Sequence, residues 1–218
     1  MAEEIPLFPL NTVLFPGMPL PLHIFEPRYR EMIGLCSTED RPFGVVLIRE
    51  GVEVGEPAVP FEVGTMARII GVDRMPDGRM NIITVGTRRF RLLGYTTEKK
   101  PYIVGDVEPL GDEHPPDEGL VQLAAEVGAL TQRYLTLIQA ASGQELTPLQ
   151  VPTDPEEVSY LVGANIRIHN PERQQLLEMV SAAERLRAEK EILERETKTI
   201  EEFLQRRSSG SLGPFSRN

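Results

Sequence analysis

Asp112-Glu113-His114-Pro115-Pro116-Asp117 divides this 218-residue sequence into two regions with different hydrophobic patterns. The stretch is polar, and its prolines disfavour helical backbone in the residues that precede them. Ahead of it, apolar residues alternate or form short runs, whereas behind it they recur at helical spacing. We therefore predict an α+β fold with a β domain at residues 1–113 and a helical domain at residues 114–207.

The first region has the pattern of a small barrel or sandwich, with short β-rich runs separated by glycine and proline. Pro76-Asp77-Gly78 lies between two of these runs, and Asp-Gly is a strong hairpin signal because glycine tolerates positive φ. Alternation in residues 89–92 places Phe90 and Leu92 on one face and the two arginines on the other. The predicted strands are residues 5–10, 18–22, 43–49, 64–73, 80–87, 89–93 and 102–109.

One helix interrupts the predicted strands, at residues 26–33. Pro27 occupies a first-turn position, where its missing N–H removes no helical hydrogen bond. We expect this helix to plug the barrel or to cover it. Its apolar face carries Phe25, Tyr29, Met32 and Ile33.

The second region predicts three helices. The first covers residues 117–141, and the second covers residues 154–164 with Asp154 as N-cap and Pro155 in the first helical position. A loop is expected at residues 142–153 and a disordered, serine- and glycine-rich tail at residues 208–218.

The predicted third helix is the longest element and covers residues 171–206, with Asn170 as N-cap. At about 1.5 Å per residue it would extend about 54 Å, so we expect its C-terminal half to project or to pack against another surface. Self-association as a coiled coil is a second interpretation, although Lys190 falls on the apolar stripe. The stripe repeats every seven residues at Met179, Leu186, Leu193 and Ile200.

The net charge of −10 is concentrated in the middle third of the chain, where residues 102–165 carry eleven acids and one base, Arg133. Such a field repels phosphate backbones and argues against nucleic-acid binding there. It is typical of a solvated acidic surface, and a site for a basic partner is the alternative. Acids at the N-terminus and short apolar runs predict neither a secretory signal nor a membrane span, so we expect a cytoplasmic protein.

The sequence lacks the motifs of the common catalytic sites. It has no G-x-x-x-x-G-K-[ST] phosphate loop, no G-x-G-x-x-G and no G-x-S-x-G elbow. His23 and Glu26 could supply two metal ligands, but no second cluster accompanies them, and a structural role for His23 is favoured. The single cysteine, Cys36, excludes an intramolecular disulfide and is expected to be a small core residue. We predict a non-enzymatic protein without cofactor or metal.

Three arginines, Arg88, Arg89 and Arg91, surround Phe90 in the one basic-aromatic cluster. This pattern could stack on and neutralise single-stranded nucleic acid, which makes RNA binding the alternative function. Alternation assigns Phe90 to the core, however, and favours a solvated strand face for the arginines.

Several motifs resemble the N-terminal domain of Lon proteases, in that family's order. Ile5-Pro6-Leu7-Phe8-Pro9-Leu10-Asn11-Thr12-Val13-Leu14-Phe15-Pro16-Gly17 and Pro19-Leu20-Pro21-Leu22-His23-Ile24-Phe25-Glu26-Pro27-Arg28-Tyr29 resemble its opening. The resemblance continues in residues 43–46, 64–69, 77–79 and 86–92 and returns in residues 174–178 and 184–186. It covers about residues 5–206.

The resemblance implies a PUA-like β pseudo-barrel followed by a helical domain, in agreement with the pattern above. In Lon proteases this region recognises substrate polypeptide, and an AAA+ module and a Ser-Lys protease follow it. Neither module has a counterpart in this sequence, which implies a stand-alone protein-binding module, a substrate adaptor or a chaperone-like factor. Expected partners are unfolded or specific polypeptides, and a separate protease or chaperone.

The candidate binding residues lie near the N-terminus. Phe15, Pro16 and Met18 form a proline-flanked run that could offer exposed apolar contacts, because prolines leave strand edges unpaired and methionine adapts to varied partners. Burial of Phe15 and Met18 in the core is the equally weighted alternative. Phe25, Arg28 and Arg30 complete the set, and local ion pairs that fix the helix are the alternative role for the arginines.

Overall fold

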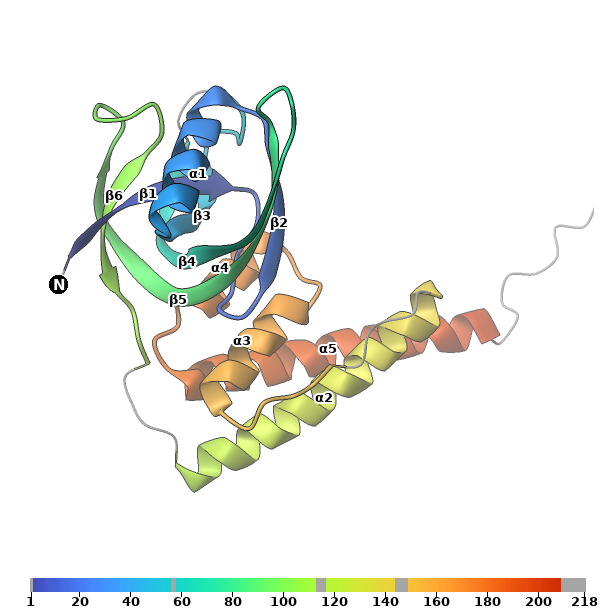
Figure 1. The fold of residues 1–218 in the computed structure, drawn as a ribbon. Coiled ribbons are helices and arrows are strands. Elements are labelled where there is room, and N and C mark those ends of the chain that lie inside the picture. The colour runs from blue at the N-terminus through green and yellow to red at the C-terminus, as the bar shows by residue number, and fades with distance from the viewer. Residues whose placement is uncertain (1, 56–57, 113–116, 144–148, 209–218) are drawn as a thin grey trace, which may run out of the picture.

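The computed structural model describes residues 2–55, 58–112, 117–143 and 149–208. Within these ranges strands dominate before residue 112 and helices after residue 117, so the predicted α+β class is confirmed (Figure 1). Residue 113 of the proposed boundary, residues 144–148 of the predicted loop and residues 209–218 of the predicted tail lie outside the described part, whereas Ser142 and Ser208 are the last residues of helices. The elements are β1 (Glu3–Leu10), β2 (Pro19–Ile24), α1 (Pro27–Glu39), β3 (Phe43–Glu50), β4 (Val59–Arg74), β5 (Met80–Thr96), β6 (Val104–Pro109), α2 (Glu118–Ser142), α3 (Pro155–Asn165), α4 (Asn170–Glu178) and α5 (Ala182–Ser208).

The six strands form one sheet in the order β2-β5-β4-β3-β1-β6, and β6 also pairs with β5, which closes the sheet into a barrel. Only β1 and β3 are parallel among these pairs. The expected strands 80–87 and 89–93 are one continuous strand, β5, so the division between them was wrong. β5 is long because its first half pairs with β2 and its second half with β6.

The predicted hairpin joins β4 to β5. Gly78 has φ of 82°, and its N–H donates to the carbonyl of Met75. A side chain there would also meet the Arg30 guanidinium, since an ideal Cβ lies 2.0 Å from Arg30 Nη2. The positive φ therefore favours glycine, whereas the Arg30 side chain could move to make room for a Cβ.

α1 covers one side of the curved sheet, and α2 to α5 lie on the other side (Figure 1). Tyr29, Met32 and Ile33 are buried in a cluster with strand residues such as Phe43, as the helical spacing predicts. Phe25 does not share this face, because it precedes the helix and is 47% exposed.

Two helices, α2 and α3, begin with an aspartate N-cap, of which only that of α3 was predicted. Asp154 caps α3 by accepting a hydrogen bond from the backbone N–H of Glu157, with Pro155 in the first turn. Asp117 caps α2 by accepting from the N–H of Leu120. A side-chain acceptor at each N-cap satisfies a backbone donor that has no partner within the helix.

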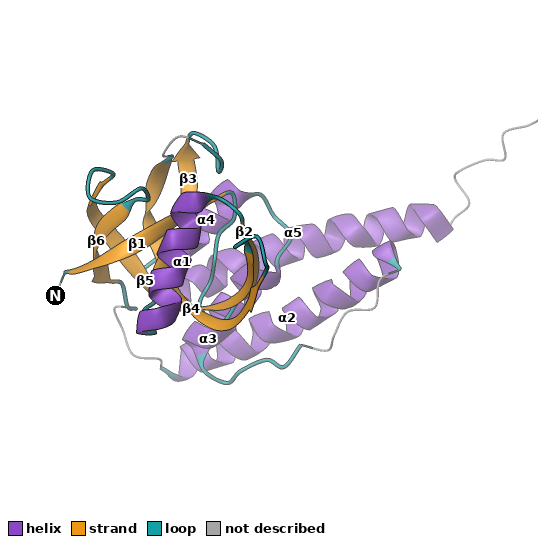
Figure 2. Ribbon diagram, turned by 45° about the horizontal axis from the view of Figure 1, so that its top comes forward, coloured by secondary structure: helices purple, strands orange, loops and turns teal. Residues whose placement is uncertain are grey.

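The predicted single helix over 171–206 is wrong, because the chain breaks it at residues 179–181 into α4 and α5 (Figure 2). His169 rather than Asn170 is the N-cap of α4. α5 has 27 residues and so extends about 40 Å. It packs along α2, and Leu186 and Leu193 of the heptad stripe are fully buried between these helices and α3. The apolar stripe of α5 thus packs against helices of the same chain.

Candidate functional site

A groove of about 620 Å³ lies between the segment that leads into β2 and the exposed side of α3. One wall is formed by residues 16–19, and the other by α3 together with Leu149 and Pro152. The residues along α3 follow helical spacing and so form one continuous face. The groove is lined by Pro16, Gly17, Met18, Pro19, Thr87, Leu149, Pro152, Glu156, Glu157, Tyr160, Leu161, Ala164 and Asn165.

Phe15 holds the first wall against the helices. Its side chain is fully buried in a cluster with Tyr160 and Leu176, and an ideal Cβ on Gly163 would lie 2.5 Å from its ring. The Arg173 guanidinium lies 5.5 Å from the ring centroid of Phe15. Phe15 is therefore a core residue that fixes the distance between the two walls. Of its two equally weighted interpretations, burial in the core is confirmed and exposed contact is wrong.

The strand beyond this wall has a blocked edge. The carbonyl of Met18 accepts a hydrogen bond from the N–H of Gly86, so the alternation of an antiparallel pair directs the backbone of Pro19 and Pro21 away from β5. Proline has no N–H to donate. This edge therefore suits side-chain contacts better than the addition of another strand.

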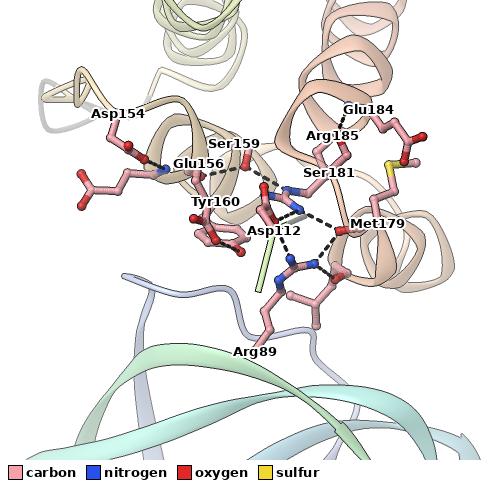
Figure 3. A network of polar contacts seen from close by, with 12 residues as sticks. Arg89, Asp112, Asp154, Glu156, Ser159, Tyr160, Met179, Ser181, Glu184 and Arg185 are labelled. Carbon is pink, nitrogen blue, oxygen red and sulfur yellow. Dashed lines mark hydrogen bonds and ion pairs between the residues drawn. The ribbon is translucent and has the colours of Figure 1, made fainter. Parts of the chain in front are cut away.

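A buried polar network supports α3 from behind the groove (Figure 3). Asp112 accepts from Arg89 Nη2 at 2.6 Å and from Arg185 Nη2 at 2.9 Å. Both arginine side chains are 0% exposed and Asp112 is 9% exposed. The two guanidiniums lie 5.4 and 4.6 Å from the Tyr160 ring centroid. Asp112, which follows β6, thus connects β5 to α5 through these two arginines. The connection lies directly beneath Tyr160, which lines the groove.

The same arginines account for the break between α4 and α5. Arg89 Nη1 donates to the carbonyls of Leu177 and Met179, and Arg185 Nη1 also donates to Met179 at 2.7 Å. Carbonyls that a continuous helix would bind internally are therefore taken by buried cations. Ser181 directly precedes α5, and its Oγ accepts from the N–H of Glu184.

Tyr160 connects this network to the acidic end of the groove. Its hydroxyl donates to Glu156 Oε1 at 2.6 Å, and burial strongly raises its pKa, so it remains a neutral donor. Arg185 Nε donates to Ser159 on the same helix. α3 is thereby fixed in position at two adjacent residues.

The structure brings two of the predicted binding residues, Pro16 and Met18, into the groove. The other surface candidates lie elsewhere, around α1. Arg28 pairs with Glu26 at 3.0 Å and lies 4.5 Å from the ring centroid of Tyr29, which supports the local structural role.

Sequence reasoning missed the α3 wall. Leu161 and Ala164 carry it, together with two glutamates of the first turn. One signal was available in the sequence. Val158 and Val162 already supply the apolar face that α3 buries, so the further apolar residues Leu161 and Ala164 indicated a second apolar face.

The basic-aromatic cluster around Phe90 does not form a common surface. Phe90 is 1% exposed and lies in the barrel core, as alternation predicts. Arg89 is also 1% exposed, so the solvated strand face predicted for it is wrong. Alternation directs Arg89 out of the barrel, but the helices cover that side of β5.

The remaining chemical candidates have structural partners. His23 Nδ1 lies 2.7 Å from Asn81 Oδ1 on the neighbouring strand. Cys36 lies on the buried face of α1, and burial raises its pKa to about 11, which keeps the thiol protonated and unreactive at neutral pH. Among the described residues, no three potential metal ligands are grouped.

Comparison with known proteins places this architecture in one family. The profile of the ATP-dependent protease La (LON) substrate-binding domain matches residues 4–195. Lon protease from Parabacteroides distasonis is 31% identical over 208 residues, which cover 92% of this chain and 25% of that protein. Lon protease 1 from Hydrogenovibrio crunogenus is 27% identical over 178 residues, or 81% of this chain and 22% of that protein.

Two solved structures share the fold. The Lon N-terminal domain protein from Xanthomonas campestris has a TM-score of 0.61 at 29% identity, over 85% of this chain and 95% of that chain. The N-terminal domain of Mycobacterium avium complex Lon protease has a TM-score of 0.66 at 21% identity, over 88% and 98% of the two chains.

A closed barrel with one covering helix, packed against a helical unit across a shared core, defines an α+β protein with the Lon N-terminal architecture. The chain belongs to the LON substrate-binding domain family. It spans about a quarter of the length of the Lon proteases that it matches. In the described ranges, no helix is both long and apolar enough to cross a membrane.

Proposed function

We propose that this protein is a non-catalytic polypeptide-binding module and that the groove along α3 receives an extended segment of its partner. The observation that carries the proposal is an apolar groove formed jointly by residues 16–19 and α3, in a member of the LON substrate-binding domain family. In the cell, such a module would act as a substrate adaptor or chaperone-like factor beside a separate protease or chaperone.

The dimensions of the groove suit a short stretch of unfolded chain. α3 has 11 residues and is about 16 Å long, which matches about five residues of extended polypeptide. Met18 and Leu161, from opposite walls, offer flexible apolar contacts. Thr87 Oγ1 donates to the Met66 carbonyl and Asn165 Nδ2 to the Leu161 carbonyl, so both side chains retain an oxygen that can accept from a bound backbone N–H.

Binding of a fluorescently labelled, permanently unfolded model protein tests this proposal. Leu161→Gln keeps the side-chain length and helix propensity but removes apolar surface from the groove, so we expect binding to weaken at least threefold. Val121→Gln is the matched control, because Val121 is 48% exposed on α2, away from the groove. No binding above that of a folded protein of the same size would refute the proposed function, and equal binding by both variants would refute the groove as its site.

A further inference from the structure

The groove has two chemically different ends. Glu156 and Glu157 occupy the first turn of α3, whereas Leu161 and Ala164 lie one to two turns further along the same face. Glu157 is exposed, and Glu156 is half-buried and accepts the Tyr160 hydroxyl on one oxygen. One end can therefore attract a cation and the other can accept an apolar side chain.

No described residue that lines the groove carries a positive charge to offset these glutamates. Three arginines lie close to the groove. Arg89 and Arg185 lie behind Tyr160, are fully buried and are bound by Asp112. Arg173 lies behind the first wall and is half-buried, and its Nη2 donates to the Val13 carbonyl and lies 3.8 Å from Met18 Sδ. The sequence segment that contains α3, residues 102–165, holds eleven acids and one base. The two charged side chains that line the groove are therefore both acidic, and a segment that placed an acid beside Glu157 would be repelled.

We propose that the groove selects extended segments in which an apolar residue and a lysine or arginine are about three positions apart. This inference rests on the proposed function and names its substrate class. Seven residues of helix separate Glu157 from Ala164, which is about 10 Å. An extended chain of the polyproline II type, in which every third side chain shares one face, covers that distance in about three residues. The apolar side chain lies beside Leu161 and Ala164, and the cation lies beside Glu157.

This arrangement predicts that the affinity for a peptide depends on the peptide's charge, and that the effect is modest. An exposed ion pair changes affinity by about two- to fivefold, and salt reduces the effect. We expect a basic peptide to bind about threefold more tightly than its neutral counterpart at low salt and an acidic one to bind more weakly still. Because the blocked β2 edge offers few backbone donors, side chains are expected to dominate recognition.

Fluorescence anisotropy with four labelled seven-residue peptides tests the proposal. Each peptide has one leucine in a Ser/Gly background. Three of them have lysine, glutamine or glutamate three positions after the leucine, and the fourth has lysine six positions after it. Wild type is compared with Glu157→Gln and with Glu118→Gln. Glu118 is the matched control, since it is also an exposed acid in the first turn of a helix, on α2 outside the groove.

Among the peptides with a spacing of three, we expect the affinity to fall from lysine to glutamine to glutamate. We expect the lysine preference to be lost when the spacing is six. Glu157→Gln should reduce the preference to about half or less, whereas Glu118→Gln should leave it unchanged. Equal affinities for the four peptides, or a preference that survives Glu157→Gln, would overturn the inference while the proposed function stands. Failure of these peptides alone, with the unfolded protein still bound, would also overturn it. Failure of the peptides and the unfolded protein together would refute the proposed function itself.

Discussion

Substitution of Asp112 by asparagine should destabilise the fold strongly while leaving its shape intact. The carboxylate serves two buried guanidiniums, with Arg89 Nη2 at 2.6 Å from one oxygen and Arg185 Nη2 at 2.9 Å from the other. Asparagine retains one oxygen acceptor but replaces the other oxygen with an NH₂ group. That group would face an arginine donor, and two positive charges would remain without a counter-charge.

The expected loss follows from the burial of the partners. Removing one member of a buried ion pair costs about 3–5 kcal/mol, because the remaining charge stays desolvated. Both guanidiniums also donate to the carbonyl of Met179, and this hydrogen bonding would still partly compensate the two buried charges in the variant. We therefore expect a value near the lower limit, about 3 kcal/mol, or on the order of a 100-fold change in the unfolding equilibrium constant.

Urea denaturation followed by circular dichroism measures this loss. Glu3→Gln is the matched control, because it also removes a carboxylate from an arginine, Arg88, but in a pair with exposed fractions of 46% and 54%. Its effect should not exceed about 1 kcal/mol. A loss below 1 kcal/mol for Asp112→Asn, or one equal to that of the control, would refute the structural role assigned to the network.

Three further predictions concern the core and the α5 helix. Phe15→Ala should cost about 3–5 kcal/mol in the same assay, whereas Phe25→Ala, at a 47% exposed position, should cost less than about 1 kcal/mol; equal losses would contradict the assignment of Phe15 to the core. Gly163→Ala should cost about 1–3 kcal/mol, since its Cβ would lie 2.5 Å from the Phe15 ring, and a neutral effect would contradict the close packing. Burial raises the pKa of Glu189 well above its ordinary value of 4.5, so ionisation opposes folding: the cost is absent below about pH 4 and grows as the pH rises through the unfolded value. The stability advantage of Glu189→Gln over wild type should consequently widen between pH 4 and pH 8 in urea titrations, and a constant difference would contradict this mechanism.

Local patterns predicted the β region well because its residues follow short-range rules. Alternation identified Phe90 and Leu92 as core, and Asp77-Gly78 identified the β4–β5 hairpin. The division of β5 failed because its length is determined by two different neighbours, β2 and β6, which are distant in the sequence. The N-caps Asp117 and Asp154 were predictable, since capping is a contact across three residues.

The break between α4 and α5 depends on a contact that local patterns do not contain. Arg89, about ninety residues earlier in the chain, takes the Met179 carbonyl from the helix. A weak signal was nevertheless present, because Ser181 and Glu184 have the spacing of a capping box at the start of α5. The seven-residue spacing of apolar residues continues through Met179, and this spacing favoured one uninterrupted helix over a new helix start at Ser181.

The candidate groove was predicted only on one side. Proline and methionine composition indicated Pro16 and Met18, and both line it. The opposite wall depends on the packing of α3 across the Phe15 cluster, which buries one face of the helix and leaves Leu161 on the other. A single helix pattern does not reveal which of its two apolar faces will be covered. The fixed position of α3 instead follows from the network around Asp112.

The central claim is that an unfolded polypeptide binds along α3. A photo-crosslinking amino acid placed at position 161, and separately at position 121, tests it most directly, with the protein mixed with the unfolded model protein and the crosslinks mapped by mass spectrometry. The account predicts efficient crosslinks from position 161, competition by a leucine-lysine peptide, and background levels from position 121. Equal crosslinking from both positions, or none from position 161 when binding is otherwise detected, would contradict it.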